Sequence, residues 1–66
     1  MKSYGECLRI ARHERGISQM KLSEISGVWT SAIDKIERGI TANPRIATIE
    51  ALAKALDMTI DELLNK

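Results

Sequence analysis

Five side chains suited to hydrogen bonding and stacking lie within two helical turns, at Trp29, Thr30, Ser31, Asp34 and Lys35. At this spacing they can share one face of a helix. In a DNA major groove, a lysine amine can donate to guanine O6 and N7, and a carboxylate can accept from a cytosine amino group. The hydroxyls of Thr30 and Ser31 can contact several bases and therefore discriminate weakly. The pattern predicts a surface that reads base edges.

The helix before this surface is defined by its caps. Ser18 is a good N-cap, so the helix begins near Gln19. Leu22 and Ile25 lie one turn apart and are expected to face a core. Gly27 can adopt the left-handed conformation that ends a helix.

The second helix of the pair carries the base-reading surface on its polar side. Val28, Ile33 and Ile36 give it an apolar stripe, and Gly39 is its natural end. Residues 19–38 therefore have the layout of a helix-turn-helix motif, in which the second helix enters the major groove.

Three more helices are predicted around this motif. Ser3 and Glu6 have the spacing of a capping box for a first helix that ends near Gly16. Pro44 indicates a loop between residues 39 and 45. Apolar residues then recur at helical spacing, at Ile46, Ile49, Leu52, Ala53 and Leu56. Thr59 and Glu62 form a second capping-box pattern for a last helix that runs to Leu64, so we expect an all-α bundle of five helices.

The length and composition limit the class of protein. Sixty-six residues make one domain, 1–66, near the lower size limit for a core without disulfides or metal. Cys7 is the only cysteine, and there is no long apolar run or signal-peptide pattern. We therefore expect a cytoplasmic protein that does not enter a membrane. The net charge is only +1, but basic residues outnumber acidic ones up to Arg45, which favours a phosphate-facing half.

Little in the sequence favours an enzyme. The only histidine, His13, is six residues from Cys7 and falls on a different helix face. There is no glycine-rich phosphate loop. We expect no catalytic residues, no metal, no cofactor and no small-molecule ligand.

The motifs resemble those of the lambda-repressor-like, or Xre-type, helix-turn-helix family. The resemblance rests on three stretches: ISQMKLSEISGV at 17–28, IDKIERG at 33–39 and NPRIATIEALAKALDMTIDELL at 43–64. It covers nearly the whole chain and implies a bacterial or phage transcriptional regulator of the repressor type. The ordered set of motifs is more specific than any one of them.

The resemblance also implies roles for individual residues. Trp29, Thr30, Ser31, Asp34 and Lys35 occupy base-reading positions or lie beside them. The expected contacts to the DNA backbone or the minor groove come from Ser18, Gln19, Lys21, Arg38, Thr41, Asn43 and Arg45. Arg12 is implied to pair with Glu37 and tie the first helix to the third.

Two positions depart from the family pattern. Trp29 stands where Ser or Thr usually caps the recognition helix, and its side chain cannot accept the capping hydrogen bond. Thr30 or Ser31 then becomes the candidate cap, with the helix starting one residue later, and the indole either faces DNA or folds over Val28. Asp57 replaces a usual Gly, so the turn there needs a left-handed Asp or another geometry.

Assembly is predicted from the C-terminal end. Met58, Ile60, Leu63 and Leu64 are more apolar than one end of a small bundle requires, so they are either core residues or a dimer interface, as in similar repressors. We expect a homodimer that binds double-stranded DNA at a palindromic operator. The alternative is a protein-interaction module of the same fold, either an adaptor or the antitoxin of a toxin pair.

Overall fold

Five helices form the part of the chain that the computed structural model describes, residues 2–66. They are α1 (Tyr4–Glu14), α2 (Gln19–Ser26), α3 (Thr30–Glu37), α4 (Ile46–Ala55) and α5 (Ile60–Leu64). No strand occurs between residues 2 and 66. The predicted all-α fold of five helices is therefore confirmed.

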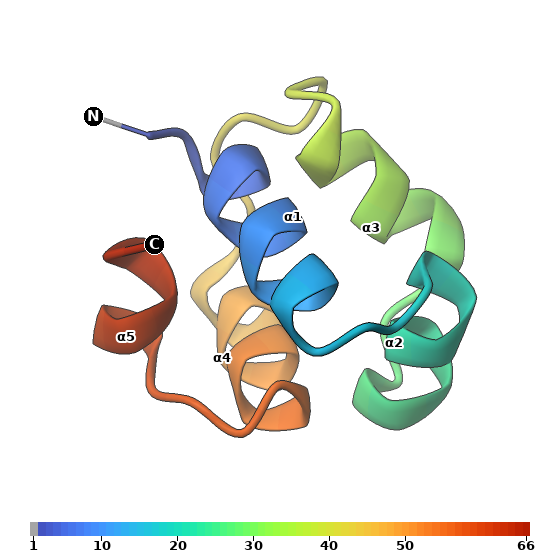
Figure 1. Ribbon diagram of the computed structural model, residues 1–66. Coiled ribbons are helices and arrows are strands. Elements are labelled where there is room, and N and C mark those ends of the chain that lie inside the picture. The colour runs from blue at the N-terminus through green and yellow to red at the C-terminus, as the bar shows by residue number, and fades with distance from the viewer. Residues whose placement is uncertain (1) are drawn as a thin grey trace.

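The helices enclose one core as a closed ring of neighbours. Helix α1 packs on α3, α3 on α2, α2 on α4, α4 on α5, and α5 on α1. In Figure 1, α1 lies between the α2–α3 pair on one side and α5 on the other. The motif and the C-terminal helix therefore lie on opposite sides of the molecule.

Side-chain caps define the starts of three helices. Ser3 and Glu6 form a capping box on α1, and Thr59 and Glu62 form another on α5. Hydrogen bonds from the backbone N–H and the hydroxyl of Thr59 lower the pKa of the exposed Glu62 carboxyl. Ser18 caps α2 by accepting from the backbone N–H of Lys21 at 3.0 Å. These predicted helix starts are confirmed.

The turns contain backbone conformations that the sequence predicts. Gly27 ends α2 at φ 78°, where a residue without a Cβ is least strained. Asp57 has φ 58°, and it is the only non-glycine residue with positive φ among those described. The left-handed Asp is therefore the geometry adopted after α4, which ends at Ala55 with Leu56 as its C-cap.

Ile25 was expected to face the core, and this expectation was wrong because it is exposed. Ile25, near the end of α2, lies beside a shallow groove whose α4 wall includes Ala51 and Ala55. The side chains of these two alanines are too short to cover Ile25. Ile46, the first residue of α4 and a member of its apolar stripe, is also exposed. The core itself is formed by side chains of all five helices, among them Leu8, Leu22, Ile33, Leu52 and Leu63.

Candidate nucleic-acid interface

Helix α3 has one buried face and one exposed face. Ile33 and Ile36 are almost fully buried and fix the helix in the core. The opposite side exposes four of the predicted base-reading residues, Trp29, Thr30, Ser31 and Lys35, whereas Asp34 is half-buried. The structure thus brings the five side chains together on one element.

Trp29 stands immediately before α3 and does not cap the helix with its side chain. It occupies the N-cap position, and no side chain caps this helix. Its carbonyl accepts from the N–H groups of Ala32 and Ile33, both at 3.0 Å. The expectation that Thr30 or Ser31 takes over as cap was wrong, because the helix already starts at Thr30. Trp29 is 81% exposed, so its indole does not fold over Val28.

A buried ion pair ties α1 to the end of α3, as the resemblance implies. Arg12 donates from Nε and Nη2 to the two carboxylate oxygens of Glu37, at 2.7 and 3.0 Å. The side chains are only 11% and 5% exposed. The hydrogen bond to Glu37 raises the pKa of Arg12, and burial opposes that rise. Arg12 also donates to the carbonyl of Ile17 at 2.8 Å, so it fixes the loop before α2 as well.

Gln19 faces α3 through its side chain. Its amide nitrogen Nε2 lies 3.2 Å from Glu37 Oε1 and 3.5 Å from Asp34 Oδ1. The phosphate contact expected at Gln19, through the free N–H groups at the start of α2, stays a prediction. The sequence contains the donor and both acceptors, but no local pattern indicates that they meet.

The basic side chains expected to contact DNA, at phosphates or at bases, differ in their ion pairs. Arg38 pairs with Asp34 at 3.1 Å in an exposed contact, and Lys21 lies 4.0 Å from Glu24. Lys35 and Arg45 are exposed and form no ion pair with any residue in the described range. These two side chains are therefore the most available donors on this side.

The loop between α3 and α4 is attached to the end of α3. The N–H groups of Ile40 and Thr41 donate to the carbonyl of Lys35, at 2.9 and 3.1 Å. Asn43 is exposed farther along, and Arg45 is the N-cap residue of α4. In Figure 1 this loop runs past the N-terminal end of α1 on its way from α3 to α4.

Gly5 is a positioning residue that the sequence analysis missed. It is buried in α1, and a Cβ there would lie 2.1 Å from the carbonyl oxygen of Ile36. Only a glycine allows α1 and the end of α3 to approach this closely. A glycine inside a helical pattern is the signal that could have indicated it.

The C-terminal residues divide between core and surface. Leu63 is 1% exposed and belongs to the core, so its assignment to a dimer interface is corrected. It is buried because α5 turns this side chain toward α1 and α4. Met58 and Ile60 are half-buried, whereas Leu64 is 38% exposed. Met58 and Ile60 line an open groove between α4 and α5, together with charged residues such as Glu50 and Lys54.

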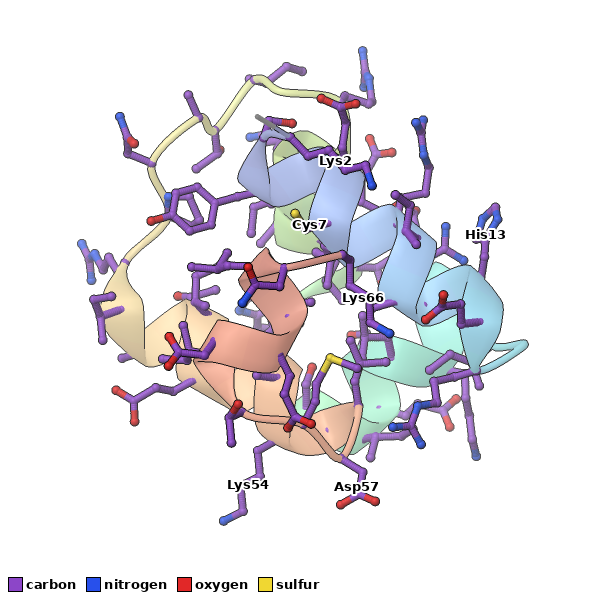
Figure 2. All side chains as sticks on the ribbon, turned by 60° about the vertical axis from the view of Figure 1, so that its left-hand side comes forward. Lys2, Cys7, His13, Lys54, Asp57 and Lys66 are labelled. Carbon is purple, nitrogen blue, oxygen red and sulfur yellow. The ribbon has the colours of Figure 1, made fainter. Side chains whose placement is uncertain are left out.

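Cys7 and His13 lie far apart in Figure 2, where Cys7 is inside the fold and His13 points outward. The Cys7 thiol is buried and lies 3.6 Å from the carbonyl of Leu64. Within residues 2–66, no three His, Cys, Asp or Glu side chains are grouped closely enough to hold a metal ion. No helix in the described range has the length and apolar character needed to cross a membrane.

Comparison with known proteins identifies close relatives. The Helix-turn-helix family model matches residues 8–63. The HTH-type transcriptional repressor RghR of Bacillus subtilis (strain 168) is 41% identical over 66 residues, which is all of this chain and 49% of RghR. The chain thus spans about half the length of this relative.

Two solved complexes with DNA have the same fold. The crystal structure of SinR, the master regulator for biofilm formation, in complex with DNA has a TM-score of 0.87 at 34% identity, covering 92% of this chain and 97% of that one. The P22 c2 repressor in complex with synthetic operator 9T has a TM-score of 0.82 at 35% identity, covering 96% and 94%. The five-helix arrangement is therefore one that DNA-bound proteins share.

Proposed function

The chain belongs to the helix-turn-helix family, and on that premise we propose that it binds a specific sequence of double-stranded DNA and regulates transcription as a repressor. The relatives support this proposal because they are named transcriptional regulators or were solved on DNA. The proposed place of action is the bacterial cytoplasm, at the nucleoid.

The main observation in support of this proposal is the exposed face of α3. Its buried face is fixed by Ile33, Ile36 and the Arg12–Glu37 pair, so the helix is held rigidly. Its other face presents an indole, two hydroxyls and a lysine to solvent. A rigid helix with short polar side chains at its N-terminal end fits the dimensions of a major groove.

We assign the backbone contacts to the two sides of this helix. The free N–H groups at the start of α2, near Ser18 and Gln19, favour a phosphate. Lys21 and Arg38 add charge on the motif side, and Thr41, Asn43 and Arg45 do so from the loop before α4. Such contacts set register and affinity, whereas base contacts set the sequence.

The size of the domain supports a symmetric dimer. Two successive major grooves on one side of B-DNA lie roughly 34 Å apart. The longest extent of the domain is 28 Å, so one domain cannot place helices in both grooves. We therefore propose a homodimer on a two-fold operator, with the partner contact at the C-terminal end through Met58, Ile60 and Leu64.

The test is selection of bound sequences from a random duplex library at two salt concentrations. Enrichment of a palindrome with half-sites about one helical turn apart supports an operator-binding dimer. Salt-sensitive binding without an enriched sequence contradicts specific recognition and leaves a non-specific binder.

A protein-interaction module, either an adaptor or an antitoxin, remains the second candidate. The observation that favours it is the exposed apolar side chains of Met20, Ile25 and Trp29 on the motif. Absence of any DNA binding in the selection would favour this function instead.

A further inference from the structure

Gln19 holds a position between two carboxylates of α3. Its Nε2 lies 3.2 Å from Glu37 Oε1 and 3.5 Å from Asp34 Oδ1. A primary amide has two N–H donors, so the same nitrogen can serve both acceptors. The start of α2 is thereby connected to two successive turns of α3.

The Glu37 side of this contact is fixed. Arg12 holds both carboxylate oxygens of Glu37, and Arg12 is itself held by the carbonyl of Ile17. The Glu37 side chain is only 5% exposed. Gln19 therefore bonds to an acceptor that cannot move easily, and this fixes where its second N–H points.

The Asp34 side of the contact is more accessible. Asp34 Oδ1 faces Gln19, while Oδ2 accepts from Arg38 Nη1 at 3.1 Å. The side chains of Asp34 and Arg38 are partly and largely exposed, respectively. An exposed ion pair of this kind is worth little, so a DNA phosphate can compete for Arg38 at small cost.

We propose that Gln19 is a positioning residue that holds Asp34 against α2, that Arg38 exchanges Asp34 for a DNA phosphate, and that Asp34 then selects cytosine. This inference rests on the proposed function. A carboxylate in the major groove can accept from the cytosine amino group and is repelled by groups that present only acceptors. Asp34 lies one turn beyond Thr30 on α3 and its side chain is 38% exposed, so it can read a base next to those that the helix start contacts.

The competing role for Gln19 is a direct phosphate contact. A phosphate contact contributes equally to all sequences, so its loss weakens binding to the operator and to random DNA alike. A positioning residue instead changes the base preference at one position, and because the glutamine amide is neutral its loss leaves the salt dependence unchanged in either role. The two roles therefore predict different changes in base preference.

The experiment compares the full chain with Gln19→Met, Asp34→Asn and the double variant on the selected operator and on its single-base variants. Methionine keeps the side-chain length without the donor. We expect each single variant to lower the preference for cytosine at the same position by about tenfold. The double variant should lose no more than the larger single loss, because both changes remove one contact.

Two further variants keep the outcome interpretable. Gln19→Glu places a third carboxylate beside Asp34 and Glu37, so it should impair binding more than Gln19→Met, and adding Asp34→Asn should restore part of the loss. Glu24→Gln is the matched control, because Glu24 lies on the exposed side of α2 beside Lys21. It should leave base preference unchanged.

Several outcomes would overturn the inference. A Gln19→Met variant that weakens all sequences equally, with unchanged base preference, assigns Gln19 to a phosphate. Additive effects of the two substitutions, or an Asp34→Asn variant with unchanged preference, exclude the proposed coupling. Failure of the unsubstituted chain to enrich any sequence instead rejects the proposed function.

Discussion

Helix α3 carries two ion pairs three residues apart that differ in burial. Arg12–Glu37 joins α1 to α3 and is largely buried, whereas Asp34 pairs with Arg38, the C-cap residue of α3, in a more exposed contact. A buried pair leaves an uncompensated charge when one partner is removed, whereas an exposed pair is worth about 0–1 kcal/mol. The buried side of α3 therefore fixes the helix, and the exposed side is free to exchange partners.

The largest effect should come from breaking the buried pair. Arg12→Ala is expected to lower the free energy of unfolding by about 3–5 kcal/mol, because Glu37 stays buried without its partner. Urea unfolding followed by circular dichroism measures this loss. In a domain of this size it is a large share of the total stability.

Arg38→Ala is the matched control for that measurement. It removes an arginine from the other pair on the same helix and should cost less than about 1 kcal/mol. Equal losses in the two variants would contradict the distinction between a fixed and an exchangeable side. The variant with both Arg12→Ala and Glu37→Ala should lose less than the sum of the single losses.

Gly5→Ala should also act on the fixed side. The added Cβ would meet the Ile36 carbonyl, so α1 and α3 must separate. We expect a loss of about 1–3 kcal/mol in the free energy of unfolding, even though alanine is the better helix former.

Gly16→Ala is the comparison for a glycine that is needed for its backbone conformation and not for close packing. Gly16 has φ 65° with open space around it, so its substitution is strained only through the backbone.

Gly5→Ala should lower DNA affinity as well as stability, because it moves the end of α3. A Gly5→Ala variant as stable as the original chain would show that the close approach is not required.

The exposed side should respond in DNA binding and not in folding. Lys35→Ala is expected to weaken operator binding by about 1–3 kcal/mol and relax the preference at one or two base pairs. Arg45→Ala should weaken all sequences more uniformly and flatten the salt dependence. Arg9→Ala, on the exposed side of α1, is the control that should change neither. Equal losses for Lys35→Ala on operator and random DNA would refute its base contact.

Features that depend on residues close together in the sequence are the ones that the sequence predicts well. Caps at Ser3, Ser18 and Thr59 depend on residues three positions apart, so spacing alone predicts them. The left-handed Asp57 also follows from local chemistry. The pairing of Arg12 with Glu37 came from family resemblance, since nothing local connects two residues so far apart in sequence.

Burial was harder to predict because it depends on which other helix covers a residue. Ile25 and Ile46 fit the apolar stripes of their helices but extend past their neighbours. Leu63 is covered, whereas the adjacent Leu64 is partly exposed. Gln19 lies between Asp34 and Glu37 because α2 and α3 pack against each other. Residue spacing alone therefore could not predict its contacts with these two carboxylates.

The smallest expected effect concerns Trp29, where stability and recognition should change in opposite directions. Helix α3 lacks the side-chain cap that α1, α2 and α5 have. Trp29→Ser supplies a hydroxyl that can accept from a free N–H of the first turn, which should raise the free energy of unfolding by about 1 kcal/mol. The same change removes an 81% exposed indole from the base-reading face and should lower operator affinity.

Trp29→Ala separates the two contributions, because it removes the indole without adding a cap. Its stability should stay close to that of the original chain, while its operator affinity should fall as far as that of Trp29→Ser. Unchanged affinity in both variants would exclude Trp29 from the interface. A stabilised Trp29→Ser variant with weaker binding would instead mean that the exposed side of α3 keeps a contact with DNA at the expense of a helix cap.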